Sequence, residues 1–246
     1  MSKDFAFKEL DVEGMQTLEA IAAASQFNEW MYKTTAKNLQ GRILEIGSGI
    51  GNISAFYLRD KRALHLSDIR DNYCEFLQEQ FGAAESLEGI VNLDLVDPDF
   101  DRKYAAHFES FDGLFALNVV EHIEDDQLAI ANAKKLLKKG GRMVILVPAF
   151  QALYNHFDTA LEHYRRYNKK RLARLFEVNG LQIERKEYFN LVGIAGWFFS
   201  GTILKKRVIP SGQMKLYNAL VPIFKIVDRV AFKQWGLSVI VEGTKV

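Results

Sequence analysis

The segment of the chain most suited to binding chemistry is a glycine loop that follows a short apolar run. It reads Leu44-Glu45-Ile46-Gly47-Ser48-Gly49-Ile50-Gly51-Asn52. Glycines let a backbone turn tightly and approach a ligand closely. The dinucleotide fingerprint G-x-G-x-x-G serves a pyrophosphate at a helix N-terminus, and its third glycine would fall at Asn52. The observed G-x-G-x-G spacing therefore favours a ligand without a phosphate, held flat against the backbone.

Polar residues also follow the next expected strands. Asp68 ends the strand expected over 63–67, where its carboxylate can accept hydrogen bonds from both hydroxyls of a ribose. Asp94 lies at the end of the strand expected over 89–95, in a position to meet an adenine amino group. Asn118 and Val119 end the strand expected over 111–120, where a backbone carbonyl can hold an ammonium group. Together these positions predict a nucleoside-type ligand.

Histidines mark where a second molecule could meet this ligand. His122 follows the strand over 111–120, and two interpretations of it stay open: it faces a substrate, or it orients the loop and caps the next helix. The polar segment over 150–167 is irregular and lies after the fifth strand, so we expect His163, Tyr164 and Arg165 to face the substrate. Arg165 or Arg166 can bind a carboxylate or phosphate, while the other is solvated.

The same segment raises the question of a metal. It carries His156, Asp158, Glu162 and His163. This spacing matches no closed metal site, and four polar residues on a loop are usually only a loop. The sequence therefore predicts no metal.

These residues need a sheet to bring them together. Helices are expected over 15–26 and 27–39, followed by strands over 42–47, 63–67, 89–95, 111–120 and 142–148 that alternate with helices near 52–60, 71–81 and 125–138. A helix over 169–179 and strands over 181–189 and 237–246 complete the pattern. Such alternation predicts an α/β, doubly wound, mostly parallel sheet with its ligand at the carboxyl ends of the strands.

The ordered set of motifs resembles the class I S-adenosylmethionine-dependent methyltransferases. The resemblance covers about residues 27–190 and rests on Glu45-x-Gly47-x-Gly49-x-Gly51, Asp68, Asp94 and Asn118-Val119-Val120-Glu121-His122. It implies a Rossmann-like sheet of seven strands whose last strand is antiparallel. It also implies S-adenosylmethionine as cofactor and S-adenosylhomocysteine as product.

The resemblance further implies roles for single residues. Glu45 would help to place the methionine end of the cofactor, and Gly47 and Gly49 would leave room for it, within the loop that also contains Ser48 and Gly51. Asp68 would bind the ribose and Ile69 would pack on the adenine. Asp94 and the Leu95 amide would read the adenine edge, and Asn118 and Val119 remain the cofactor positions whose backbone carbonyl can hold an ammonium group.

A basic, aromatic insertion separates the last two expected strands. We expect one domain over 1–246, made of a cofactor-binding core over 27–188, a helical insertion over 189–234 and a final strand over 235–246. Residues 214–232 predict an amphipathic helix, or a helix pair broken at Pro222. This insertion is either a lid packed on the sheet edge or a surface for a lipid-linked substrate or an anionic membrane. The region over 150–246 is similar to a bacterial methyltransferase group with H-Y-R-R-Y and G-W-x-x-x-G segments, which suggests a sugar or polyprenyl-linked acceptor.

The charge distribution agrees with this division. The chain has 32 Lys and Arg against 31 Asp and Glu, a net charge of +1. Residues 1–188 hold 24 basic and 29 acidic side chains, whereas residues 189–234 hold seven basic and one acidic. We expect no nucleic-acid partner, and we expect an anionic acceptor or surface to meet the insertion. The single cysteine, Cys74, and the lack of a leader or a spanning segment predict a cytoplasmic protein.

The sequence thus predicts methyl transfer from S-adenosylmethionine to a small-molecule or sugar- or lipid-linked acceptor, at a hydroxyl oxygen. A general base is needed only if the acceptor arrives protonated. Two alternatives stay open. One is an NAD(P)-dependent oxidoreductase, which the loop spacing and the lack of a Tyr-x-x-x-Lys pair near the fifth strand disfavour. The other is a non-catalytic, membrane-peripheral module that binds the cofactor. The oligomeric state is not predicted.

Overall fold

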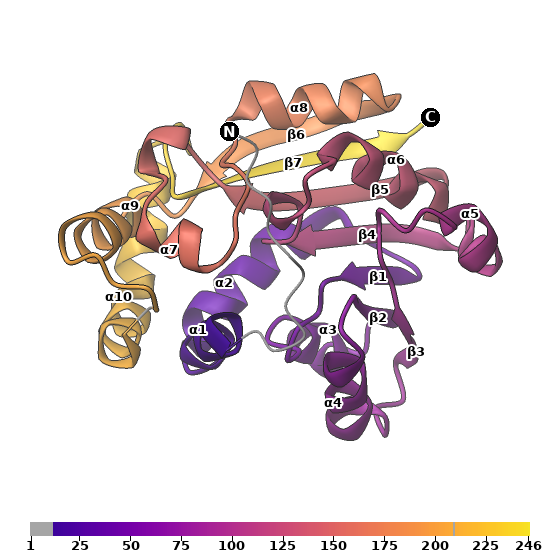
Figure 1. Cartoon of the computed structure of the whole chain (residues 1–246), viewed down its shortest axis with the longest axis horizontal. Helices are drawn as coiled ribbons and strands as arrows, with labels where there is room; N and C mark the ends of the chain where they lie inside the picture. The colour runs from indigo at the N-terminus through magenta and orange to yellow at the C-terminus, as the bar shows by residue number, and fades with distance from the viewer. Residues whose placement is uncertain (1–11, 209) are drawn as a thin grey trace.

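A seven-stranded sheet forms the centre of this computed structural model, which describes residues 12–208 and 210–246 (Figure 1). Its order is β3-β2-β1-β4-β5-β7-β6. The strands are β1 (Ile43–Ile46), β2 (Leu64–Asp68), β3 (Leu87–Asn92), β4 (Phe111–Leu117), β5 (Leu137–Pro148), β6 (Leu181–Phe189) and β7 (Ser238–Lys245). Strands β1 to β5 pair in parallel, whereas β7 is antiparallel to both β5 and β6. The predicted mostly parallel sheet with an antiparallel last strand is confirmed.

Helices cover both faces of this sheet. They are α1 (Val12–Ala22), α2 (Ser25–Thr35), α3 (Ser54–Arg59), α4 (Asp71–Phe81), α5 (Phe100–Lys103), α6 (Asp126–Leu136), α7 (His156–Ala160), α8 (Lys169–Val178), α9 (Gly193–Trp197) and α10 (Ser211–Val230). Short 3-10 turns join several of them, and a π-helical stretch over Phe198–Ile203 follows α9.

The expected helix boundaries differ from the observed ones in several places, most clearly before β5. The helix expected over 125–138 ends at Leu136, because Leu137 adopts an extended backbone and pairs with Phe111 as the first residue of β5. The chain over 211–230 is one helix with Pro222 inside it, which confirms the single amphipathic helix of the two alternatives. Met214, Val221 and Asp228 lie seven residues apart and are buried, so packing of this face holds the helix together across the proline.

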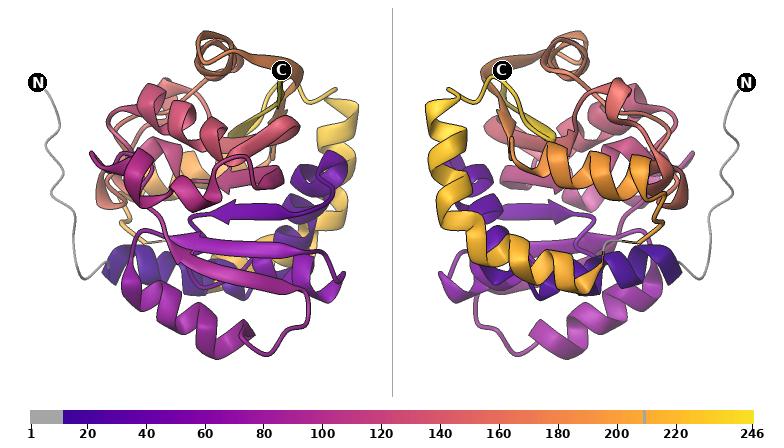
Figure 2. Two further views of the ribbon diagram at one scale, coloured as in Figure 1. Left: turned by 90° about the vertical axis from the view of Figure 1, so that its right-hand side faces the viewer. Right: turned by 90° about the vertical axis from the view of Figure 1, so that its left-hand side faces the viewer.

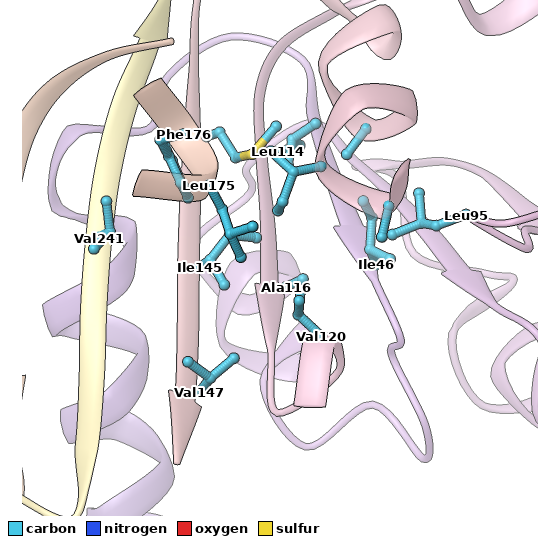
Figure 3. Packing of buried hydrophobic residues seen from close by; sticks show 14 of the residues in the cluster. Ile46, Leu95, Leu114, Ala116, Val120, Ile145, Val147, Leu175, Phe176 and Val241 are labelled. Carbon is cyan, nitrogen blue, oxygen red and sulfur yellow. The ribbon is translucent and has the colours of Figure 1, made fainter. Parts of the chain in front are cut away.

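The core consists of two layers, one on each face of the sheet. Alternate residues of a strand enter opposite layers: Ala116 and Ile145 lie in one, whereas Phe115 and Val144 lie in the other. Figure 3 shows part of the first layer, to which Val147 also belongs. The apolar run over 143–148 is therefore buried on both faces, which confirms the predicted doubly wound arrangement.

The carboxyl ends of the parallel strands are where the other elements converge. Helices α1, α7, α9 and α10 gather at this end, at the left of Figure 1. Helices α9 and α10 belong to the insertion between β6 and β7, and α10 lies along the outer edge of the molecule (Figure 2). Among the described residues, no helix combines the length and the apolar character needed to cross a bilayer.

Candidate functional site

A cavity of about 990 Å³ lies at the carboxyl ends of the strands. Its walls come from α1, from the loops after β1, β2, β3 and β4, from the segment over 157–166 and from the insertion. This is the end of a doubly wound sheet at which ligands bind. The cavity therefore connects the expected cofactor positions with the polar segment after β5.

The glycine loop makes one wall of the cavity. Gly47 and Gly49 both have left-handed backbone, with φ of 70° and 54°. A Cβ atom on Gly47 would lie 2.4 Å from the Val119 side chain, so only glycine fits there. Gly51 has another reason to be glycine, because its Cβ would lie 2.3 Å from Phe81 of α4. Gly51 does not line the cavity.

Asp68 stands beside this loop at the end of β2. One carboxylate oxygen accepts a hydrogen bond from the Gly49 N–H at 2.9 Å, and the other accepts one from the Arg70 N–H at 3.1 Å. Burial raises the pKa of Asp68, while these two N–H groups favour its charged form. Each carboxylate oxygen has two lone pairs, so Asp68 can still accept two hydrogen bonds from a ligand.

Glu45 and Ser48 lie behind the loop and do not line the cavity. The buried Glu45 carboxylate accepts a hydrogen bond from the Ser54 hydroxyl, and burial raises its pKa to about 8. Ser48 joins β2: its N–H donates to the Ser67 carbonyl at 2.8 Å, and its hydroxyl accepts from the Ser67 N–H at 3.2 Å. In this structure both residues shape the loop.

The remaining expected cofactor positions line the cavity. Strand β3 ends at Asn92, so Asp94 and Leu95 lie on the following loop, and Asp94 there accepts a hydrogen bond from the Val96 N–H at 2.9 Å. Ile69 is 39% exposed, so its side chain offers an apolar surface to the cavity. The other members of this group are Asn118 and Val119, which follow β4.

His122 and His163 meet edge to face at the other end of the cavity, with ring centroids 4.7 Å apart. His163 is buried, and its Nδ1 lies 2.8 Å from Asp158 of α7. The same Asp158 oxygen accepts from Arg166 Nε at 2.7 Å, and its second oxygen accepts the Asn155 N–H in a capping box. Burial works to raise the pKa of Asp158, but its bonds with His163 and Arg166 hold it below the ordinary value.

Glu121 lies next to this pair and is a site residue that sequence spacing does not indicate. It is fully buried, and neither carboxylate oxygen has a hydrogen-bond partner among the described residues. Burial raises the pKa of Glu121 to about 8. His122 is accessible from the cavity. Desolvation by the surrounding protein and the nearby His163 nevertheless lower the pKa of His122 well below its ordinary value.

Ligand atoms of Glu121, His122 and His163 lie within 4.8 Å of one another, a distance at which they could hold a metal ion. The expectation of no metal rests on the spacing within the 156–163 segment, whereas this set combines that segment with the loop after β4. The absence of a metal stays a prediction.

The structure places the expected arginine away from the cavity. Arg165 donates to the Ile123 and Glu124 carbonyls at 3.1 and 2.7 Å and pairs with Asp126 at 2.9 Å. It thereby ties the segment after β5 to the loop before α6. The neighbouring Arg166 lines the cavity instead, buried below the Trp197 ring. Tyr164 also lines the cavity, and its N–H donates to the Glu121 carbonyl at 2.8 Å.

Residues 44–143 match the family model described as "Methyltransferase domain". Lovastatin nonaketide synthase mokA from Monascus pilosus is 32% identical over 108 residues, which is 42% of this chain and 3% of that protein. Methyltransferase GfsG from Streptomyces halstedii is 26% identical over 124 residues, 50% of this chain and 43% of that protein. The chain thus spans less than half the length of these relatives.

Solved structures share the fold. Phosphoethanolamine N-methyltransferase 2 from Haemonchus contortus, in complex with S-adenosyl-L-methionine, superposes with a TM-score of 0.58 at 18% identity, over 89% of this chain and 52% of that chain. A SAM-dependent methyltransferase from Archaeoglobus fulgidus gives 0.57 at 16% identity, over 89% and 92% of the two chains.

Proposed function

We propose that this chain, a member of the class I S-adenosylmethionine-dependent methyltransferase family, transfers a methyl group from that cofactor to a hydroxyl oxygen of a small molecule. The observation that carries the proposal is the bond between Asp68 and the Gly49 N–H, in the cavity that also contains His122 and His163. When bound, the cofactor supplies a methyl group on a positively charged sulfur. The protein then has mainly to align donor and acceptor.

The cofactor end of the cavity fits this molecule. The spare lone pairs of Asp68 suit the two ribose hydroxyls, and the exposed Ile69 suits the face of the adenine. Asp94 and the Leu95 N–H would read the adenine edge, and Gly47, Gly49, Asn118 and Val119 would enclose the amino-acid end. Glu45, Ser48 and Gly51 would act through the shape of the loop.

The acceptor end is assigned to His122, His163 and Tyr164. A hydroxyl group arrives protonated and must lose its proton before or during attack, and the imidazole nitrogens are groups placed beside its oxygen. Asp158 is a positioning residue, because its carboxylate holds Nδ1 of His163. Arg165 is a second positioning residue, since it fixes the loop that carries His122.

Calorimetric titration with S-adenosylhomocysteine tests the cofactor assignment. We expect one saturable site per chain, because Asp68 and the glycine loop form one hydrogen-bonded arrangement that lines the cavity. NADH, followed by its fluorescence, should not bind, because the loop lacks the third glycine of the dinucleotide fingerprint. The reverse pattern, NADH binding without S-adenosylhomocysteine binding, would make the chain an oxidoreductase.

The insertion supports a finer proposal, namely a lipid-linked acceptor presented at a membrane surface. Its helix α10 has an apolar outward face made of Leu216, Ile223, Ile226 and Val230, each between 56% and 69% exposed. The opposite face packs on the protein through Met214 and Val221. Lys205, Lys206, Arg207, Lys215 and Arg229 add positive charge nearby. An amphipathic helix with basic flanks is typical of proteins that lie on anionic membranes.

Vesicle sedimentation tests this membrane contact. The double change Ile223→Ser and Ile226→Ser should reduce binding to phosphatidylglycerol vesicles several-fold, because it removes apolar area from the outward face. The matched control is Leu128→Ser, which changes an exposed leucine on α6. Equal binding by the double variant and the wild type would instead make the insertion only a lid.

A further inference from the structure

Glu121 is an unusual residue because its buried carboxylate has nothing to pair with. It is 0% exposed, and the described part of the chain offers neither oxygen a hydrogen-bond partner. Burying a carboxylate in this way costs free energy unless a proton or a cation compensates it. Glu121 also lines the cavity, so the missing partner can come from there.

The Glu121 carboxylate has no ion-pair or hydrogen-bond partner of its own among the described residues. The buried charges that act on Glu121 are those of Asp158 and Arg166. Arg166 Nε lies 2.7 Å from Asp158 Oδ1, so these two opposite charges neutralise each other. Asp158 is also the acidic partner of His163. When Glu121 is ionised, the three buried groups Glu121, Asp158 and Arg166 together carry a net negative charge. A bound cation would match it.

The neighbours of Glu121 have the chemistry of transition-metal ligands. Its carboxylate and the His122 and His163 nitrogens lie within 4.8 Å of one another. Two imidazoles and one carboxylate form a common donor set for zinc and ferrous iron, whereas magnesium and calcium prefer oxygen donors. Ligands of a tetrahedral ion lie about 3.4 Å apart, and the cavity-facing His122 is the side chain able to close that gap.

The hydrogen bond with Asp158 orients His163 as a metal ligand and fixes which ring nitrogen carries the proton. A carboxylate accepts hydrogen bonds, so Nδ1 of His163 must carry the proton at the observed 2.8 Å contact. The lone pair of the ring then lies on Nε2. Carboxylate–histidine–metal arrangements of this kind are the usual way in which proteins orient a histidine ligand.

We propose that Glu121, His122 and His163 bind a divalent first-row transition-metal ion in the acceptor part of the cavity. The proposal rests on the proposed function for the ion's role, though not for its binding. Three protein ligands leave a fourth position open, as in catalytic zinc sites. The acceptor hydroxyl oxygen would occupy that position.

The ion would make the acceptor oxygen reactive at neutral pH. A bound metal lowers the pKa of coordinated water from 15.7 to about 7, and it acts in the same direction on a coordinated hydroxyl. The hydroxyl proton passes to solvent water. The oxygen then uses its lone pair to form the bond to the methyl carbon, and the electron pair of the broken carbon–sulfur bond stays on sulfur. In this account the two histidines hold the metal and do not themselves take the proton.

Cobalt binding tests the site without any need for the acceptor. Chelator-stripped protein is titrated with Co²⁺, and visible absorption bands report coordination by nitrogen and oxygen. We expect one ion per wild-type chain. Glu121→Gln and His122→Asn should each weaken binding at least about 100-fold, since even residues that only orient metal ligands are worth about 10- to 100-fold. The control is His156→Asn, an exposed histidine outside the cluster, which should bind like the wild type.

S-adenosylhomocysteine titration of the same samples separates this proposal from the proposed function. Wild-type protein that binds S-adenosylhomocysteine and no Co²⁺ would overturn the metal site alone. Unchanged Co²⁺ affinity in Glu121→Gln would overturn it as well. Failure of wild-type protein to bind S-adenosylhomocysteine, with Co²⁺ binding intact, would contradict the proposed function and leave the metal site standing.

Discussion

Asp68→Ala is expected to lower the affinity for S-adenosylhomocysteine by at least about 100-fold. Hydrogen bonds to a charged group contribute about 1.5–3 kcal/mol each, and each 1.4 kcal/mol is a factor of ten. Two bonds to the ribose would therefore account for a loss of this size. The substitution also removes the acceptor of the Gly49 N–H, so the loop loses part of its fixed shape. Isothermal titration calorimetry measures the change.

The control for this experiment is Asp97→Ala. Asp97 lines the same cavity, but its carboxylate pairs with Lys103 at 3.0 Å and lies in the loop after β3. Removal of the Asp97 carboxylate changes the charge of the cavity by the same amount as Asp68→Ala. We expect it to change the affinity for S-adenosylhomocysteine less than threefold. An equal loss in both variants would show that cavity charge, and not a specific contact, governs binding. If Asp68→Ala bound S-adenosylhomocysteine with wild-type affinity, Asp68 would not be part of the cofactor site.

Asp158→Ala is expected to reduce the free energy of unfolding by about 3–5 kcal/mol. Asp158 is fully buried and accepts hydrogen bonds from both His163 and Arg166. Without it, the buried Arg166 guanidinium keeps its positive charge but loses its counter-ion. The capping box with Asn155 at the start of α7 is lost as well, which costs about 1 kcal/mol. Urea denaturation, monitored by circular dichroism, measures the free energy of unfolding of the variant and of the wild type.

A surface pair provides the comparison for Asp158. Asp101 and Lys135 form an exposed ion pair between α5 and α6. Exposed pairs contribute about 0–1 kcal/mol, so Asp101→Ala should change the stability by less than about 1 kcal/mol. Asp158→Asn should fall between the two alanine variants, because its amide oxygen still accepts a hydrogen bond while the charge is gone. Similar losses in Asp101→Ala and Asp158→Ala would mean that the buried network does not hold the segment after β5.

Regular elements with a clear hydrophobic period could be predicted from the sequence. The expected helix over 71–81 and the expected strand over 181–189 coincide with α4 and β6. Their apolar spacing and their flanking turn residues determine them locally. The end of α6 was missed because pairing between Leu137 and Phe111, which are far apart in the sequence, overrides the local preference for helix.

The sequence predicts the position of a site residue only where that residue lies at the carboxyl end of a strand. Asp68 meets the glycine loop because consecutive parallel strands end at the same edge of the sheet. The directions of side chains in irregular segments cannot be read from spacing. Thus Arg165 points to Asp126 while Arg166 enters the cavity, and the buried position of Glu121 became visible only in the folded chain.

A crystal structure of the protein with bound S-adenosylhomocysteine tests the central claim most directly. The account predicts both ribose hydroxyls on the Asp68 carboxylate, the adenine against Ile69 and Leu95, and the amino-acid end along Gly47 and Gly49. The sulfur atom should then face the side of the cavity that contains His122 and His163. Electron density for the ligand at any other place, or an Asp68 carboxylate without contact to the ribose, would contradict the account.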